Sequence, residues 1–379
     1  MQFRLEKRLE PSMVMLYATP IAAVVLTMIV GAIIFSLIGF DGIGAVREIF
    51  LTPLTNSFKW QDLGVKAAPL IIIGTGLSIA YRANVWNIGA EGQYIMGGLA
   101  ATWVALATHG MTGWWILPTM LVAGVVGGAA YAAIPALLKT RLGVNEILTS
   151  LMLTYASVQL IYYLVRAPWK DPMGMGFPQT RIFSEAARLP TIIPTTIVHL
   201  GVPTAIVVAL VAWFIMSRSV FGYQMKVVGA APHAARYGGF SENRTIWLAL
   251  LVSGGLAGMA GMLEVAGPFQ RMVPGFPTNY GFTAIIVAFL GRLNPLGVIF
   301  AGIVMAITFV GGEVAQTSIG LSSSATGVFQ AMMLFFLLAG DILVRYRVKR
   351  VMPAAEASAC RPNCSLPSSS RWLVLRRRS

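Results

Sequence analysis

Hydrophobic runs, separated by short polar segments that carry most of the charges, recur along the whole chain. A helix needs about 20 apolar residues to cross the hydrocarbon core of a membrane. Ten runs can be placed, at approximately 14–39, 63–81, 86–108, 114–138, 144–166, 195–216, 245–267, 281–291, 295–312 and 324–344. The pattern predicts an all-α, polytopic integral membrane protein with about ten transmembrane helices. The eighth run is short for a full crossing, so we expect a broken or re-entrant element there.

Composition supports a membrane protein and changes how the charge is interpreted. The 379 residues are 56% hydrophobic and 11% charged, whereas about a quarter of a soluble domain is charged. A formal net charge of +14 would suit a nucleic-acid partner, but the Lys and Arg excess of cytoplasmic loops explains it in a membrane protein, so we expect no nucleic acid. Both cysteines, Cys360 and Cys364, lie near the C-terminus and predict neither a disulfide framework nor a zinc site.

The distribution of Lys and Arg predicts both termini on the cytoplasmic side, an N-in/C-in topology. We expect a cytoplasmic N-terminus over 1–13 and a transmembrane domain over 14–350. This domain includes an outer loop at 167–194, with a short interfacial helix near 183–188. The segment 351–379 is rich in Pro, Ser and Arg and lacks periodicity, which predicts a disordered cytoplasmic tail.

The longest polar interruption on the cytoplasmic side is the loop 217–244. Pro232 suits the first turn of a short helix, Gly238 and Gly239 can end it, and Ser241 can cap the following span. These residues allow two interpretations of the segment 217–244. It is either a solvated loop or a loop with a short helix that docks on a partner protein.

The third run is unusual because polar residues and glycines crowd its first half. Asn87, Glu91 and Gln93 lie there with Gly89 and Gly92. A carboxylate inside a membrane is costly and is a functional candidate by default. The alternative is that Glu91 lies at the cytoplasmic interface.

Glycine patterns also predict how helices contact each other. Gly124 and Gly128 form one small-residue contact face, and Gly254 and Gly258 form another. Asn87-Ile-Gly89 opens the third run and Asn279-Tyr-Gly281 opens the eighth. The eighth run follows the third at an offset of five runs, and an odd offset reverses the orientation, so any repeat would be inverted.

Four separated stretches resemble one family in the same order along the chain. They are VVGAAPHAARYGGF (227–240), NVWNIGAEGQYIMGG (84–98), GVNEILTSLMLTY (143–155) and GFTAIIVAFLGRLNPLGVIFAG (281–302). They are similar to permease subunits of ATP-binding-cassette (ABC) importers that serve simple sugars, nucleosides and branched-chain amino acids, and most closely to the nucleoside type. The resemblance implies a substrate path that includes Asn87, Gly89, Glu91, Gly92, Gln93, Asn145 and Glu146. It implies an ATPase-coupling helix that includes Gly229, Pro232, Ala234, Ala235, Arg236 and Gly239.

This resemblance implies the function as well. We expect the transmembrane subunit of an importer in a bacterial-type cell (inner or plasma) membrane, with the lipid bilayer as its surroundings. It would carry a nucleoside, or as second choice a simple sugar, from an extracytoplasmic substrate-binding protein. Its partners would be a separate ABC ATPase subunit and a second similar permease, or a second copy of itself.

The sequence contains no G-x-x-x-x-G-K-[ST] phosphate loop and no HExxH or nucleophile-elbow motif, so we expect no enzyme. No cofactor is expected on this chain, because ATP and Mg would be bound by the partner subunit. The alternative is an ion-gradient-driven secondary transporter of a small polar solute, with Glu91 or Glu146 as the proton site. A docking helix in 217–244 would discriminate between them, because a secondary transporter needs none.

Overall fold

The computed structural model describes residues 2–7, 13–192 and 196–351, and its described part consists almost entirely of helices. The expected tail after residue 351 lies outside the described residues. In chain order, the helices are α1 (Met13–Ile38), α2 (Gly42–Phe50), α3 (Thr52–Thr55), α4 (Lys59–Arg82), α5 (Ala90–Ala107), α6 (Ile116–Leu142), α7 (Glu146–Arg166), the 3-10 turn η1 (Glu185–Ala187), α8 (Gly201–Arg218), α9 (Val220–Ala230), α10 (Pro232–Tyr237), α11 (Glu242–Glu264), the π-helical turn η2 (Val265–Phe269), α12 (Tyr280–Leu290), α13 (Pro295–Ile319) and α14 (Ser323–Arg345).

A helix lies at each of the ten predicted hydrophobic runs. Seven helices within the described residues are long and apolar enough to cross a membrane, namely α1, α4, α6, α7, α8, α11 extended by η2, and α13. These seven confirm a polytopic membrane protein. The count of ten, the orientation and the inverted repeat stay predictions.

Two short strands join the ends of the described chain. The strands β1 (Gln2–Lys7) and β2 (Tyr346–Val351) pair antiparallel, with Gln2 opposite Val351 and Lys7 opposite Tyr346. The first and last segments are therefore neighbours, as expected if both lie on one side of a membrane.

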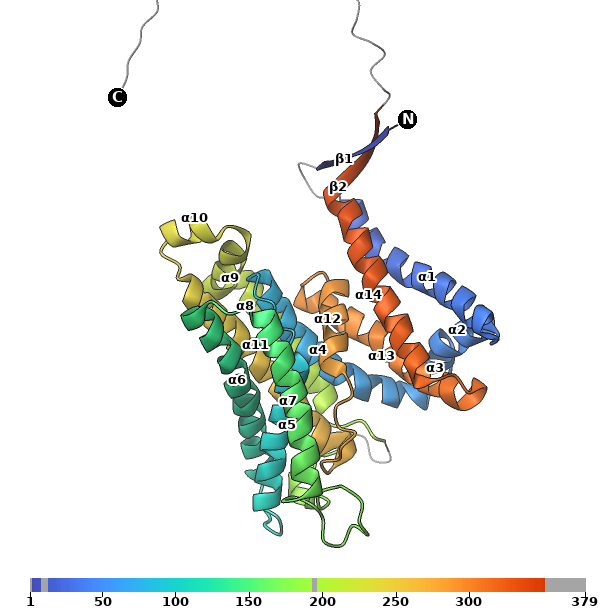
Figure 1. Ribbon diagram of the computed structural model, residues 1–379. Helices are drawn as coiled ribbons and strands as arrows, with labels where there is room; N and C mark the ends of the chain where they lie inside the picture. Colours follow the sequence, from blue (N-terminus) through green and yellow to red (C-terminus); the bar gives the residue numbers. More distant parts are fainter. Residues whose placement is uncertain (1, 8–12, 193–195, 352–379) are drawn as a thin grey trace, which may run out of the picture.

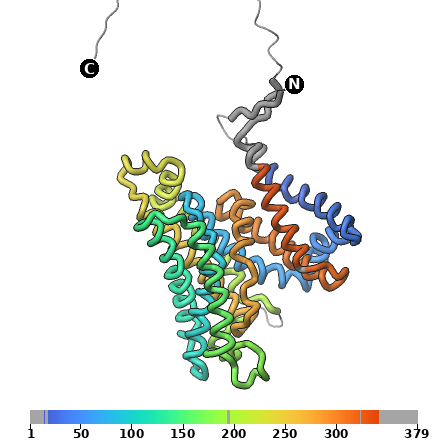
Figure 2. The backbone as a smooth tube through the Cα atoms, viewed as in Figure 1, coloured from blue at the N-terminus to red at the C-terminus, as the bar shows by residue number. Residues whose placement is uncertain are grey.

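Two helices, α4 and α11, form the centre of the molecule. In their membrane-length windows 83% and 72% of the residues are buried, against 22–28% in α1, α6, α7 and α8. A helix that is apolar on all sides must be surrounded by other helices or by lipid, and here protein surrounds α4 and α11. Figure 2 shows the pair of α1 and α14 on one side of this centre and α5, α6 and α7 on the other.

Glycines bring α5, α6 and α11 into close contact, as predicted. A Cβ on Gly128 would lie 2.2 Å from the carbonyl oxygen of Gly254, and a Cβ on Gly258 would lie 2.2 Å from that of Gly124. A Cβ on Gly97 of α5 would lie 2.2 Å from the Cα of Gly258. The two predicted contact faces therefore pack against each other, and α5 joins them.

The third run is shorter as a helix than as a hydrophobic run, and the eighth forms a helix as short as predicted. The helix α5 begins at Ala90, so residues 83–89 form a non-helical connection from the end of α4. The helix α12 has 11 residues, or about 16 Å at 1.5 Å per residue, roughly half of the hydrocarbon core. The predicted shortness of the eighth element is confirmed.

The two polar loops lie at opposite ends of the molecule. Figure 1 shows α9 and α10 at one end and the segment between α7 and α8 at the other. The latter contains the three-residue 3-10 turn η1 within the range where a short helix was expected, and its interfacial position on the outer side stays a prediction.

Candidate functional site

The starts of α5 and α12 meet inside the protein. A Cβ on Gly281 would lie 2.2 Å from the backbone N of Glu91, so the first turns of the two helices touch. The first N–H groups of any helix lack partners within that helix and give its N-terminus partial positive charge. Two such ends therefore converge where the sequence has its two Asn-x-Gly segments.

Glu91 joins these two helix starts. Its side chain is buried, and its carboxylate oxygens accept hydrogen bonds from the backbone N of Asn279 at 3.0 Å and of Gly281 at 2.5 Å. Charge-assisted hydrogen bonds from a helix start are among the stronger ones in proteins. The burial places Glu91 in the interior, and not at an exposed interface.

Asn87 and Gln93 form a closed pair beside Glu91. The Asn87 amide donates to Gln93 at 2.7 Å, Gln93 donates back at 2.9 Å, and Asn87 also reaches the Ser253 hydroxyl at 3.0 Å. All three side chains are buried. This network fixes the non-helical connection before α5 against α11.

The glycines of this segment allow α5 to approach α7. A Cβ on Gly89 would lie 2.7 Å from the Ser150 Cβ, and a Cβ on Gly92 would lie 2.9 Å from the Thr154 Cα. The five predicted path residues in α5 and in the connection before it are therefore brought together. The polar groups of their side chains form hydrogen bonds within the chain.

The two predicted path residues of α7 lie at its first turn. Asn145 caps the helix, because its Oδ1 accepts from the backbone N of Ile147 at 2.9 Å. Glu146 forms an ion pair with Lys139 of α6 and faces the backbone N of Trp86 at 3.5 Å. Glu146 thus borders the connection 83–89 but does not join the Glu91 cluster.

The predicted coupling helix forms as α10. Pro232 occupies its first turn, Gly238 follows its last residue, and Gly239 has a φ of +79°, which glycine adopts without strain. Ser241 caps α11, as expected. The helix inferred from punctuation by Pro and Gly is confirmed.

The α10 side chains divide into a buried and an exposed set. Ala235 is 1% exposed and packs inward, so it supports the helix from within and is not available to a partner. Ala234 is exposed, and Tyr237 is 95% exposed. Arg236 pairs with Glu242 at 2.6 Å while remaining largely exposed.

The helix α9 was not predicted, although the sequence carries a signal for it. Its N-cap is Ser219, whose side chain accepts from the backbone N of Gly222. Phe221, Met225 and Val228 recur at helical spacing and point inward. This short apolar period lies within a segment that is mainly polar and basic, so the segment resembles a loop in the sequence.

Gly229 lies where α9 meets the end of α4. A Cβ at this position would be 2.0 Å from the carbonyl oxygen of Arg82. Backbone therefore contacts backbone, and the α9–α10 segment (220–237) rests directly on the last turn of the central helix α4.

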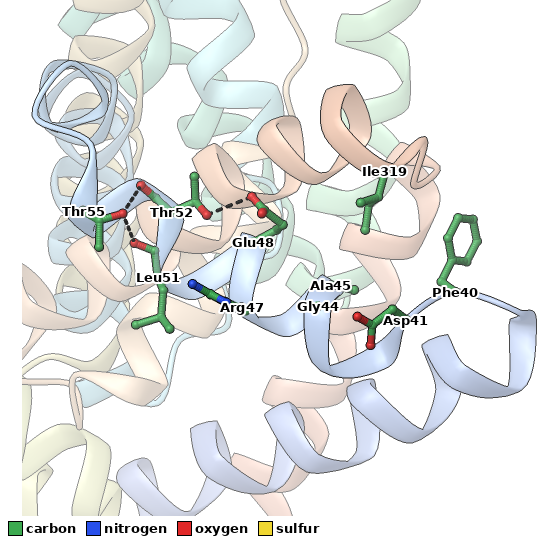
Figure 3. A pocket seen from close by; sticks show the side chains of 10 residues that line it. All are labelled: Phe40, Asp41, Gly44, Ala45, Arg47, Glu48, Leu51, Thr52, Thr55 and Ile319. Atoms are coloured by element: carbon green, nitrogen blue, oxygen red, sulfur yellow. Dashed lines mark hydrogen bonds between the residues drawn. The ribbon is translucent and has the colours of Figure 1, made fainter.

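Two pockets lie among α2, α3, α13 and α14, away from α9 and α10. One, of about 550 Å³, is lined mainly by α2 and α3, with Arg47, Glu48 and Asp41 on its wall (Figure 3). Thr52 already donates to Glu48 there at 2.8 Å. A second pocket, of about 260 Å³, lies where the start of α12 meets α13 and α14.

Similarity to known proteins covers most of the chain. Residues 61–338 match the model of the family described as "Branched-chain amino acid transport system / permease component". A glucose ABC transporter permease protein of Haloferax volcanii is 35% identical, over 88% of this chain and 90% of its own length. A nucleoside ABC transporter permease protein of Lactococcus lactis is 27% identical, over 89% and 93% of the two chains. A guanosine ABC transporter permease protein of Bacillus subtilis is 28% identical, over 86% and 94%.

Proposed function

The chain belongs to the branched-chain amino acid transport system permease family as the transmembrane subunit of an ABC importer, and we propose that its cargo is a nucleoside or a simple sugar. It is a multi-pass protein of a bacterial-type inner or plasma membrane. The observation that carries the cargo proposal is that relatives named for glucose, nucleosides and guanosine align with this chain over 86–89% of its length. These cargoes share a hydroxyl-bearing ring without net charge.

The coupling proposal rests on the exposed face of α10. A separate ATPase subunit would receive Ala234, Arg236 and Tyr237, with Ala235 holding the helix from behind. Tyr and Arg are enriched among the residues that dominate binding energy at interfaces. The 95% exposure of Tyr237 on a helix of six residues supports its role as the anchor. Pro232 and Gly239 set the two ends of this helix.

A continuous series of contacts leads from α10 into the membrane. Gly229 touches the last turn of α4, and α4 continues into the connection 83–89. This connection carries Asn87 and leads into Glu91, which holds the start of α12. Movement of α9 would therefore be passed through α4 to both converging helix starts, a physical route of the kind that coupling between distant sites requires.

The predicted path residues have two parts in this proposal. Asn87, Gly89, Glu91, Gly92 and Gln93 keep the α5 and α12 starts together beside the path. Asn145 and Glu146 fix the first turn of α7 against the same connection, through Trp86.

The partners in this proposal are an ABC ATPase, a second similar permease or another copy of this chain, and an extracytoplasmic binding protein. The outer loop 167–194 would meet the binding protein, because it lies at the end opposite to α10 (Figure 1). ATP and Mg would be bound by the ATPase, since the chain has no phosphate loop.

The test is co-purification of the ATPase with the permease, together with uptake of labelled adenosine and labelled glucose. Tyr237→Ala should lower ATPase co-purification about tenfold or more, whereas His233→Ala, an exposed change on the same helix, should leave it unchanged. Equal co-purification of both variants with wild-type yield would contradict the docking role of α10. Uptake of neither adenosine nor glucose by the complete wild-type complex would contradict the proposed cargo class.

A further inference from the structure

We propose that the pocket between α12, α13 and α14 is a binding site for the hydroxyl-bearing ring of the cargo, on the way into the membrane. This inference rests on the proposed function and names where this chain would hold its cargo. The pocket has a volume of about 260 Å³, which is slightly below the usual range of ligand pockets, about 300–1,000 Å³. A site of this size suits one ring system and excludes large cargo.

The polar side chains of this pocket have unused hydrogen-bonding capacity. Asn279, Gln316 and Thr326 line it, the first two exposed and the third half-buried, and none of the three side chains is bonded to another described residue. An amide offers two donors and an acceptor with two lone pairs, and a hydroxyl offers one donor and two lone pairs. Sugar hydroxyl groups require this mixture, because each both donates and accepts.

Two buried hydroxyl groups lie at the back of the pocket. Thr278 is part of the pocket wall, and its side chain lies beside that of Tyr94, with both oxygens buried. A hydroxyl can donate one hydrogen bond and accept two, so these groups keep the inner wall polar even when they face each other.

Aromatic rings give the pocket an apolar wall. Phe309 lines it and packs edge-on against Tyr280, with ring centroids 5.3 Å apart. Tyr280 in turn packs edge-on against Tyr94 at 6.2 Å, and Tyr94 stacks on Phe276 at 4.8 Å. These contacts fix the Phe309 face, and an aromatic face can cover the C–H side of a sugar ring or stack on a base.

The charge of the pocket favours a neutral cargo. Glu313 lies at the pocket, and its carboxylate is paired with Lys66 of α4. One acid and one base together leave no net charge for an ionic cargo to neutralise. The Glu313 side chain is 60% exposed, so it can still accept a hydrogen bond from a hydroxyl group.

In the predicted orientation, with both termini on the cytoplasmic side, the position along α13 places the pocket in the outer half of the membrane. Phe309 and Gln316 lie 14 and 21 residues after Pro295, the first residue of α13 (309 − 295 and 316 − 295), which is about 21 and 32 Å along the helix axis. With α13 starting on the cytoplasmic side, the pocket faces the side from which a binding protein delivers cargo.

The experiment measures the concentration dependence of uptake in proteoliposomes that contain the complete complex. The cargo is labelled adenosine or glucose, whichever the wild-type complex transports. The double variant Thr278→Val/Gln316→Leu removes one hydroxyl and one amide without adding bulk, and we expect its KM to rise about tenfold. The control is Thr317→Val on the same helix, whose hydroxyl bonds to its own backbone at Glu313 and Val314 and whose KM should not change.

The outcomes separate this inference from the proposed function. If the wild-type complex transports neither solute, the proposed cargo fails. If the wild type transports one of them and the double variant keeps the wild-type KM, the pocket is not a cargo site. If the double variant loses co-purification of the second permease subunit, the partner subunit fills the pocket and the inference is overturned.

Discussion

Replacing Gly229 with alanine should separate the α9–α10 segment from the core and uncouple transport from ATP hydrolysis. The added Cβ would lie 2.0 Å from the Arg82 carbonyl oxygen and 2.9 Å from the Arg82 carbonyl carbon. Close carbon–oxygen contacts in proteins lie at about 3.3–3.6 Å, so the backbones must move apart by about 1.3 Å. This contact joins the proposed docking helix to α4, so the shift acts directly on coupling.

The magnitude follows from the cost of overpacking, which is about 1–3 kcal/mol for an inserted carbon group. Alanine is the better helix former by up to about 1 kcal/mol, so a loss cannot arise from weaker helix formation. If this cost destabilises only the conformation that links ATP hydrolysis to transport, cargo-stimulated hydrolysis should fall about 5- to 150-fold.

The assay is cargo-stimulated ATP hydrolysis and uptake in proteoliposomes that contain the complete complex. Gly238→Ala is the matched control, because its Cβ would meet the Ala235 carbonyl oxygen at an ordinary 3.4 Å and its φ is −77°. We expect Gly229→Ala to lose stimulated hydrolysis and uptake together, with the permease still inserted. Wild-type stimulation in Gly229→Ala would refute the proposed route through α4.

Three further predictions address the interior and the topology. Glu91→Gln should lower the thermal stability of the purified permease by about 1–3 kcal/mol, because one buried N–H of the α12 start loses its acceptor; an unchanged unfolding temperature would remove Glu91 from that role. Gly258→Leu should destabilise the α6–α11 contact, whereas Gly327→Ala, which meets nothing within 4 Å, should be neutral in the same unfolding measurement; equal effects would contradict the backbone contact. Single cysteines at Glu185 and Gln224 should react with impermeant reagents only from outside and only from the cytoplasm, respectively, and the reverse accessibility would invert the orientation.

Much of the fold can be predicted because it depends on local patterns. Long apolar runs mark the membrane helices, and Pro232 with Gly239 marks α10. The glycine spacings of α6 and α11 predict a close contact because only glycine permits backbones to approach so closely. The helix α9 was missed because its amphipathic period is short and lies in a basic segment.

The candidate site is less predictable because its contacts are distant in the sequence. Glu91 bonds to backbone groups 188 and 190 residues away, and no local pattern specifies that pairing. The inward orientation of Ala235 depends on how α10 rests on its neighbours, which six residues do not determine. The pocket between α12, α13 and α14 exists only once three helices have packed, so its residues were absent from the sequence-based set.

The most direct test of the account is the energy source of uptake. Proteoliposomes containing the permease, its ATPase and its binding protein should accumulate labelled adenosine or glucose when ATP is enclosed on the ATPase side. This uptake should persist when ionophores dissipate every ion gradient, and should stop when ATP is replaced by a non-hydrolysable analogue. Uptake by the permease alone, driven by an imposed proton or sodium gradient without ATP, would contradict the account and support a secondary transporter.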